Sequence, residues 1–490
     1  MRTDEHKMIP VEPLARENET APDRTDKPEE ACGVFGIWAP GEPVALHTYY
    51  ALISLQHRGQ ESAGIIVANE DGLTIDKGMG LVTDVFENSS FLSQPGFAAL
   101  GHVRYSTTGG SSFLNSQPLL IRYKGGQLAL AHNGNLVNAA ELREELEQKG
   151  SIFQSTIDSE VFAHLIARSG FAAPETALSE AVQRIRGGYA IIFLTENKLI
   201  AMRDPNGIRP LSLGKLGDNY VVASESCAFD TIGATFLREI EPGEGITIDN
   251  SGLHSFRAAP AGRHNLCAFE YIYFARPDST MYGNNIHAIR KLLGKALALE
   301  APIEADLVTG VPDSSISAAI GYAEASGIPY EMGLIKNRYM GRTFIKPTQE
   351  MRQTAVRLKL NPVRSIVEGK RVLLVDDSIV RGTTTTYIIK LLKEVGAKEV
   401  HVRISSPPYR FPCYFGIDTS ARGELIAANN TVEETRKIIG ADSLHYLSQS
   451  ALTRILAERG VQLCEACFDG NYPVRLSNNP LGKSALERRK

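Results

Sequence analysis

The chain has no long apolar run, few cysteines and little net charge. No stretch approaches the ~18 consecutive apolar residues of a membrane-spanning helix, which argues against a membrane protein. A net charge of −4 over the whole chain gives no reason to expect a nucleic-acid partner. In a cytosolic chain, six cysteines are metal ligands, nucleophiles or buried side chains more often than disulfide partners.

The net charge lies at the N-terminus. Residues 1–31 contain nine Asp or Glu and five Lys or Arg, which accounts for the whole charge of −4. Because this segment bears prolines and is poor in large apolar residues, we expect it to be disordered. It lacks the apolar core of a secretory signal and is too acidic for a transit peptide, so we expect a cytoplasmic protein. The remaining chain is long enough for two or three globular domains at about 150 residues each.

Residues 371–386 carry the strongest functional signal. A mostly β-branched and apolar run predicts a buried parallel strand that ends in Asp376 and Asp377. The hydroxyl-rich segment 381–386 then opens a predicted helix. A helix start with small residues suits a phosphate, and paired carboxylates suit sugar hydroxyls or hydrated magnesium. Taken alone, the pattern is also compatible with a solvated acidic turn and a threonine-rich cap.

This segment resembles the signature of the type I phosphoribosyltransferases, which use phosphoribosyl pyrophosphate. The resemblance implies an α/β domain with a parallel sheet, in keeping with the strand–helix alternation from about residue 270. It also implies that a second loop after a strand, residues 313–315, binds pyrophosphate. The implied ligands of phosphoribosyl pyrophosphate in these two loops are Asp313, Ser314, Ser315, Asp376, Asp377, Ser378, Arg381, Gly382, Thr383, Thr384 and Thr385. The implied magnesium ligands are Ser314, Asp376 and Asp377.

A long basic segment lies between these loops. Residues 336–359 carry seven Lys or Arg against one Glu, and they are too many for a simple connection. We interpret them as a lid over the pyrophosphate, with Arg342 and Lys346 as its contacts, because the charge matches the leaving group and closure excludes water. A solvated basic loop and a nucleic-acid patch are the alternatives.

Polar, glycine-bearing clusters interrupt the apolar runs of the N-terminal half. They follow a predicted strand that Cys32 opens, and they have the character of loops that converge on a site. The clusters are residues 56–64, 101–107, 131–135 and 158–160. Without them, Cys32 would be interpreted as an ordinary core residue.

Together these clusters resemble the glutaminase domain of the N-terminal-nucleophile amidotransferases, an α+β fold with αββα layers. The resemblance implies that residues 1–31 are a propeptide, whose removal makes Cys32 the first residue. A thiol needs a base to become a thiolate, and the freed α-amino group, with a pKa near ~8, is such a base.

The same resemblance assigns the remaining glutaminase residues. It implies an oxyanion hole from the Asn133 side chain and the Gly134 N–H, and such a donor is worth ~3 kcal/mol of barrier. The implied glutamine contacts are Arg104 for the carboxylate, Asp158 for the ammonium group, and Arg58 in support. We interpret His132 as a structural hydrogen bonder rather than a catalyst. The turn-rich segment 203–210 also matches the family, but we assign it no chemical step.

Cys464 and Cys467 form a short pair of potential metal ligands. Alone, this pair is compatible with a redox dithiol, half a zinc site or coincidence. Some amidotransferases that combine a glutaminase domain with a phosphoribosyltransferase domain carry a 4Fe–4S cluster. The resemblance implies that its ligands here are Cys267, Cys413, Cys464 and Cys467. Zinc is the alternative metal. Cys227 fits neither site, and we expect it to be buried.

Both halves resemble one family, the glutamine phosphoribosyl pyrophosphate amidotransferases of the iron–sulfur type. The implied parts are a propeptide (1–31), a glutaminase domain (32–262), a phosphoribosyltransferase domain (263–470) and a tail (471–490). Ammonia released at Cys32 would pass internally to C1 of the magnesium-bound sugar, which gives 5-phosphoribosylamine, glutamate and pyrophosphate. This is the first committed step of purine synthesis. Family members are typically homo-oligomers, dimers or tetramers, inhibited by purine nucleotides.

Three other classes of protein share part of this pattern. A different glutamine amidotransferase would lack the carboxylate pair, and a purine-salvage transferase has no use for Cys32 and Arg104. A non-enzymatic regulator that senses phosphoribosyl pyrophosphate would need a DNA-reading element, and the N-terminal segment is acidic instead.

Overall fold

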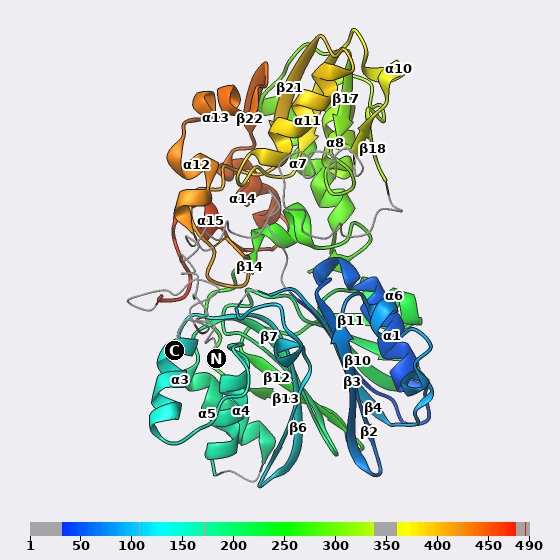
Figure 1. The fold of residues 1–490 in the computed structure, drawn as a ribbon, viewed down its shortest axis with the longest axis vertical. Helices are drawn as coiled ribbons and strands as arrows, with labels where there is room; N and C mark the ends of the chain where they lie inside the picture. The colour runs from blue at the N-terminus through cyan, green and yellow to red at the C-terminus, as the bar shows by residue number, and fades with distance from the viewer. Residues whose placement is uncertain are drawn as a thin grey trace, which may run out of the picture.

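A computed structural model describes residues 32–106, 108–170, 173–337, 360–419 and 421–476, together with Leu486. The predicted propeptide (1–31) and the predicted lid residues Arg342 and Lys346 lie outside the described residues. Two layered domains are stacked along the long axis, the N-terminal half below and the C-terminal half above in Figure 1. Within the described ranges, no helix combines the length and apolarity that crossing a bilayer requires.

The N-terminal domain is built on two antiparallel sheets. Among the described residues, one sheet has the order β11-β9-β10-β1-β4-β2-β3 and the other β13-β12-β8-β7-β6-β5. The first contains β1 (Gly33–Trp38), β2 (Ser62–Asn69), β3 (Gly72–Met79), β4 (Ala98–Arg104), β9 (Ser212–Leu216), β10 (Asn219–Ala223) and β11 (Thr235–Glu239). The second contains β5 (Leu119–Tyr123), β6 (Gly126–Leu136), β7 (Gly187–Thr195), β8 (Leu199–Arg203), β12 (Glu244–Asp249) and β13 (Gly252–Arg257).

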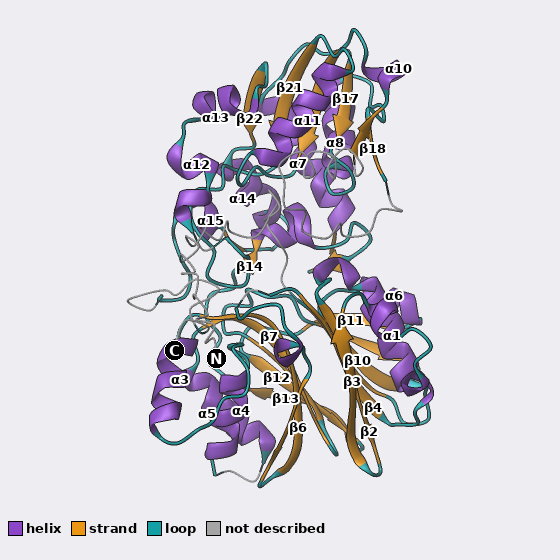
Figure 2. Ribbon diagram, in the orientation of Figure 1, coloured by secondary structure: helices purple, strands orange, loops and turns teal. Residues whose placement is uncertain are grey.

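Helices cover the outer face of each sheet, so the layers run helix–sheet–sheet–helix (Figure 2). The first sheet is covered by α1 (Val44–Ser54), α2 (Val82–Val85) and α6 (Cys227–Ile232). The second is covered by α3 (Ala139–Gln148), α4 (Glu160–Arg168) and α5 (Pro174–Arg184). Short 3-10 turns are η1 (Gln56–Arg58), η2 (Ser90–Ser93) and η3 (Phe113–Asn115). The predicted αββα glutaminase fold is therefore confirmed.

Every residue of strand β1 is apolar because both faces of the strand are buried. Successive side chains of a strand point to opposite faces. Phe35 and Ile37 pack in the cluster under α1, whereas Val34 and Trp38 pack in the cluster between the two sheets. Because both faces are buried, the strand that starts next to Cys32 is fixed on both sides.

The C-terminal domain is built on a parallel sheet in the order β17-β20-β21-β22. Its strands are β17 (Leu307–Gly310), β20 (Arg371–Asp376), β21 (Glu399–Ile404) and β22 (Ser443–Tyr446). Its longer helices are α7 (Ile286–Glu300), α8 (Ile316–Ser326), α11 (Thr383–Glu394), α13 (Val432–Ile439) and α14 (Gln449–Ala457). Leu373 and Val375 pack in one core cluster and Val372 and Leu374 in another, so β20 is buried on both faces, as predicted.

Short elements complete this half. They are β14 (Leu266–Cys267), η4 (Glu270–Phe274), β15 (Thr280–Met281), β16 (Asn284–Asn285), β18 (Leu334–Lys336), β19 (Leu360–Pro362), α10 (Arg364–Val367), η5 (Arg422–Glu424), α12 (Ile426–Asn429), β23 (Leu463–Cys464) and α15 (Ala466–Asp469). The predicted domain boundary at residue 262 falls between β13 and β14.

Buried polar contacts join the two domains. Arg58 of the N-terminal domain donates to both oxygens of Glu270 in η4, at 3.0 and 2.7 Å, and also to Glu225. The Asn135 amide donates to the Tyr414 carbonyl at 2.9 Å. Arg58, Glu225 and Glu270 are all fully buried. The junction is therefore a part of the protein interior rather than a solvated hinge.

Helices α7 and α8 touch through their backbones. A Cβ at Gly294 would lie 1.9 Å from the Ala318 carbonyl oxygen, and one at Gly321 would lie 2.0 Å from the Lys291 carbonyl oxygen. Glycine at both positions therefore sets how closely the two helices pack.

We expect Gly294→Ala to force these helices apart and to lower the free energy of unfolding by about 2 kcal/mol. Thermal or denaturant unfolding measures the change. The matched control is Gly423→Ala, because a Cβ at Gly423 meets nothing within 4 Å. Equal stabilities of the two variants would contradict the close packing of α7 on α8.

Candidate active sites

Cys32 lies at the edge of the N-terminal domain that faces the junction. It directly precedes β1, whose Gly33 pairs with Val103 of β4, so Cys32 stands beside Arg104. Its thiol is buried and donates to the Tyr105 carbonyl at 3.3 Å. Burial raises the pKa of the Cys32 thiol to about 12, although the Arg104 charge opposes that rise. A thiol in this environment needs a neighbouring base before it can act as a nucleophile.

The predicted oxyanion pair lies on β6, in the facing sheet. The Asn133 side chain is completely buried, and neither its nitrogen nor its oxygen has a hydrogen-bond partner among the described residues. Gly134 has a φ of +140°, and a Cβ there would lie 2.1 Å from the Gly188 carbonyl oxygen, so only glycine fits. A buried amide without a partner is costly, which indicates that a ligand completes it.

A contact between two histidines joins β4, which carries Arg104, to β6, which carries Asn133. His102 of β4 lies with its Nε2 3.1 Å from the His132 carbonyl oxygen of β6. Burial lowers the pKa of His102 to about 3, so its ring is neutral and Nε2 carries the donated proton. The His132 ring contacts the Ser159 hydroxyl at 2.8 Å, and its Nδ1 is 3.7 Å from Asp158. The other ring nitrogen of His132, Nε2, is buried and has no hydrogen-bond partner among the described residues.

The predicted glutamine contacts differ in how they are held. Arg104 donates to the carbonyls of Gly109 and Gly110, both at 3.2 Å, and lies 3.5 Å from Glu61. Asp158 accepts the Leu136 N–H at 2.8 Å. Glu61, which we had not singled out, also accepts hydrogen bonds from Ser106.

Arg58 stands behind Cys32 rather than beside the expected glutamine. Its Nε is 3.4 Å from the Cys32 carbonyl oxygen, and its other nitrogens donate to Glu225 and Glu270. The side chain is completely buried. Arg58 therefore contacts the backbone of Cys32, and sequence reasoning missed the two carboxylates that hold its guanidinium.

The predicted phosphoribosyl loops meet at the carboxyl edge of the parallel sheet. Strands β17 and β20 are neighbours, so the loops that follow them lie side by side. Ser315 donates to Asp376 at 2.8 Å and to Asp377 at 3.2 Å, and Ser314 donates to Asp377 at 2.5 Å. Both carboxylates are only 1% exposed. The hydroxyls thus bind a buried pair of carboxylates, and carboxylate oxygens are groups that suit a sugar diol or a cation.

The next segment has the geometry of an anion cradle with one exception. Gly382 has a φ of +86° and precedes α11, whose first residues are the predicted Thr383, Thr384 and Thr385. The N-terminus of a helix of this length favours a phosphate. Arg381, however, donates to Glu424 at 2.7 Å, so an ion pair within the protein holds its guanidinium. At the first loop, Asp313 pairs with Lys336 at 3.1 Å.

Four cysteines from three segments converge near the junction. Strands β14 and β23 pair in parallel with Cys267 opposite Cys464. The Cys467 carbonyl accepts the N–H groups of Arg410 and Phe411, which brings in the loop that carries Cys413. Burial raises the pKa of Cys464 and Cys467 well above the usual range, and the neighbouring cysteines raise it further. Cys227 is buried elsewhere, as expected.

The described residues contain no group of three His, Cys, Asp or Glu side chains that could hold one metal ion. A four-iron cluster binds one cysteine at each iron and so spaces its ligands more widely than a single ion does. The four cysteines are the set that such a cluster requires.

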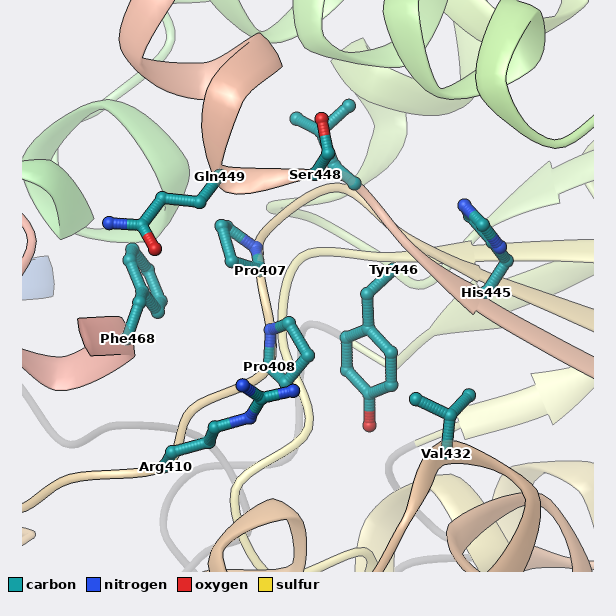
Figure 3. A pocket seen from close by; sticks show the side chains of 10 residues that line it. Pro407, Pro408, Arg410, Val432, His445, Tyr446, Ser448, Gln449 and Phe468 are labelled. Atoms are coloured by element: carbon teal, nitrogen blue, oxygen red, sulfur yellow. The ribbon is translucent and has the colours of Figure 1, made fainter.

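A separate pocket lies at the ends of β21 and β22 (Figure 3). It has a volume of about 270 Å³, and none of the predicted site residues lines it. Its lining residues are Pro407, Pro408, Arg410, Val432, His445, Tyr446, Leu447, Ser448, Gln449 and Phe468.

Comparison with known proteins assigns both halves. A family model for a glutamine amidotransferase domain matches residues 102–231, and one for a phosphoribosyl transferase domain matches residues 281–405. The amidophosphoribosyltransferase of Bacillus subtilis is 55% identical over 452 residues, covering 91% of this chain and 95% of the relative. That of Synechococcus elongatus is 49% identical over 96% of this chain and 97% of the relative.

The solved structures agree with this result. The B. subtilis glutamine phosphoribosylpyrophosphate amidotransferase, in complex with ADP and GMP, aligns with a TM-score of 0.88 and 54% identity. The alignment covers 92% of this chain and 99% of that one. The presence of both domains excludes a salvage transferase and an amidotransferase with a different acceptor. The chain belongs to the amidophosphoribosyltransferase family, the enzymes of the first step of purine biosynthesis.

Proposed function

We propose that this chain performs the family's reaction with the residues described above. Glutamine, phosphoribosyl pyrophosphate and water become 5-phosphoribosylamine, glutamate and pyrophosphate. The observation that carries the proposal is the presence, on one chain joined by buried contacts, of both the Cys32–Asn133 site and the hydroxyl–carboxylate site.

In the glutaminase half, loss of residues 1–31 frees the α-amino group of Cys32, which accepts the thiol proton. The sulfur attacks the glutamine amide carbon, ammonia leaves, and water then releases glutamate from the thioester. The Asn133 amide and the Gly134 N–H stabilise the oxyanion. The absence of any other described partner for the buried Asn133 amide supports this role. Arg104 and Asp158 bind the carboxylate and ammonium groups of glutamine.

In the phosphoribosyl half, Asp376 and Asp377 bind the ribose hydroxyls, and the start of α11 binds the 5-phosphate. Ammonia attacks C1 and pyrophosphate leaves. Magnesium, which neutralises pyrophosphate when bound, would be held by Ser314, Asp376 and Asp377. Their oxygen-only donor set suits this ion.

We also propose a 4Fe–4S cluster on Cys267, Cys413, Cys464 and Cys467. The convergence of these side chains from three segments, with all but Cys413 buried, supports it. The cluster would be structural, because it would tie the C-terminal strand β23 to the junction. Feedback inhibition by purine nucleotides is supported by the related structure with ADP and GMP. We further propose a homo-oligomer in the cytoplasm.

Cys32→Ala should lower glutamine-dependent synthesis more than about 10³-fold, because the nucleophile is lost. Synthesis with added ammonia should remain within about twofold, since the phosphoribosyl site is untouched. A coupled assay of phosphoribosylamine measures both. Cys227→Ala, a buried cysteine of the same domain, is the control and should retain both activities. Equal loss of both activities in Cys32→Ala would contradict separate sites.

Asp376→Asn with Asp377→Asn should lower synthesis from glutamine and from ammonia alike, by about 10²-fold or more. The exposed carboxylate in Glu458→Gln serves as the control in the same domain. The reaction rate is measured once with saturating glutamine and once with ammonia in place of glutamine. Ammonia-dependent synthesis at the wild-type rate in the double variant would rule out these carboxylates as sugar ligands.

A further inference from the structure

Arg209 is a buried cation whose hydrogen-bonding capacity is mostly unused. Its side chain is 0% exposed, and its Nε donates to the Phe415 carbonyl at 2.8 Å. The two terminal nitrogens have no hydrogen-bond partner among the described residues, although one lies 3.6 Å from Glu270. A guanidinium has five N–H donors, and leaving buried charged donors unmet is costly. A group outside the described residues should complete this guanidinium.

Another buried arginine of the same turn shows the usual arrangement. Arg203 donates to the carbonyls of Arg209, Ile240 and Gly207, at 2.7 to 2.8 Å, and to the Tyr282 hydroxyl. Its guanidinium therefore has partners on every nitrogen. Arg209 differs from Arg203 because its two terminal nitrogens have no such partners. Both arginines belong to the segment 203–210, to which the sequence analysis assigns no chemical step.

The Arg209 guanidinium lies among the segments that carry the four cysteines. The Ile208 carbonyl accepts the Cys267 N–H at 3.1 Å, so Arg209 follows a residue that is bonded to one ligand. Its acceptor, Phe415, donates through its own N–H to the Cys413 sulfur at 3.4 Å. A Cβ at Gly416 would lie 2.6 Å from an Arg209 terminal nitrogen, so the loop approaches the guanidinium closely.

The positive charge of Arg209 is opposite in sign to the charge of a cluster held by thiolates. Four thiolates around a cluster leave the site net negative, and hydrogen bonds to sulfur together with nearby charge set the cluster's potential.

We propose that Arg209 donates hydrogen bonds from its terminal nitrogens to the sulfurs of the four-cysteine cluster and offsets its negative charge. This inference rests on the cluster assigned under the proposed function. Arg209 is then a positioning residue that favours the reduced state of the cluster and slows its oxidative loss. It also holds the Cys413 loop, through Phe415, against the N-terminal domain.

The test compares Arg209→Met, which keeps the stem without the charge, with Arg209→Lys, which keeps the charge with fewer donors. Protein is purified anaerobically, and its iron and sulfide contents are measured. The midpoint potential and the rate of bleaching in air follow on the same samples. We expect a more negative potential and bleaching at least about fivefold faster in Arg209→Met, with Arg209→Lys between it and the wild type.

Arg403→Lys is the matched control, because Arg403 is a buried arginine whose hydrogen bonds, to Ala301, Val402 and Ser443, include neither Arg209 nor a cysteine-bearing segment. It should lower the melting temperature and leave the potential and the bleaching rate at wild-type values. If Arg209→Met does not fold, Arg209→Lys alone tests the proposal. Its cluster should then bleach about twofold to threefold faster than that of the wild type. Iron present with wild-type potential and bleaching in the Arg209 variants would overturn the role of Arg209 alone. A wild type without iron would overturn the cluster itself.

Discussion

The guanidinium of Arg58, shared between Glu225 and Glu270, is the interaction on which the rest of the structure depends. It contacts the carbonyl of Cys32 on one side and the C-terminal domain on the other. Although burial favours the neutral acid, His57 and Arg58 hold the pKa of Glu225 well below its usual range. Removing one member of a buried ion pair typically costs 3–5 kcal/mol. The backbone of Cys32 therefore cannot shift without disturbing the junction.

The same junction connects the candidate glutaminase site to the C-terminal domain. Asn135, two residues beyond the Asn133 amide, donates to the Tyr414 carbonyl in the cysteine-bearing loop. The Phe415 carbonyl of the same loop accepts a hydrogen bond from Arg209, which also lies next to Glu270. Strand β6, the loop that carries Cys413 and the Arg58 network thus share contacts.

Local patterns in the sequence were sufficient for the strands and the loops that follow them. The predicted strand, residues 371–375, is observed one residue longer and ends at Asp376, because a run buried on both faces must be apolar until it reaches the sheet edge. The role of residues 313–315 was expected from family resemblance, and the pairing of β17 with β20 places this loop beside the carboxylates. Ion pairs between residues far apart in the chain leave no local pattern in the sequence. Arg58 and Glu270 are 212 residues apart, and the ion pair of Arg381 with Glu424 joins two separate loops. The convergence of Cys267 with Cys464 was expected from family resemblance rather than from their spacing.

Internal passage of ammonia is the central claim of this account, and a nitrogen label tests it most directly. Protein without residues 1–31 receives phosphoribosyl pyrophosphate and glutamine labelled with ¹⁵N in the side-chain amide. Unlabelled ammonium is added in excess over the ammonia released, at a concentration too low to support synthesis by itself. The account predicts that nearly all trapped phosphoribosylamine carries the label. Label diluted to the composition of the ammonium pool would show that ammonia leaves the protein between the two sites.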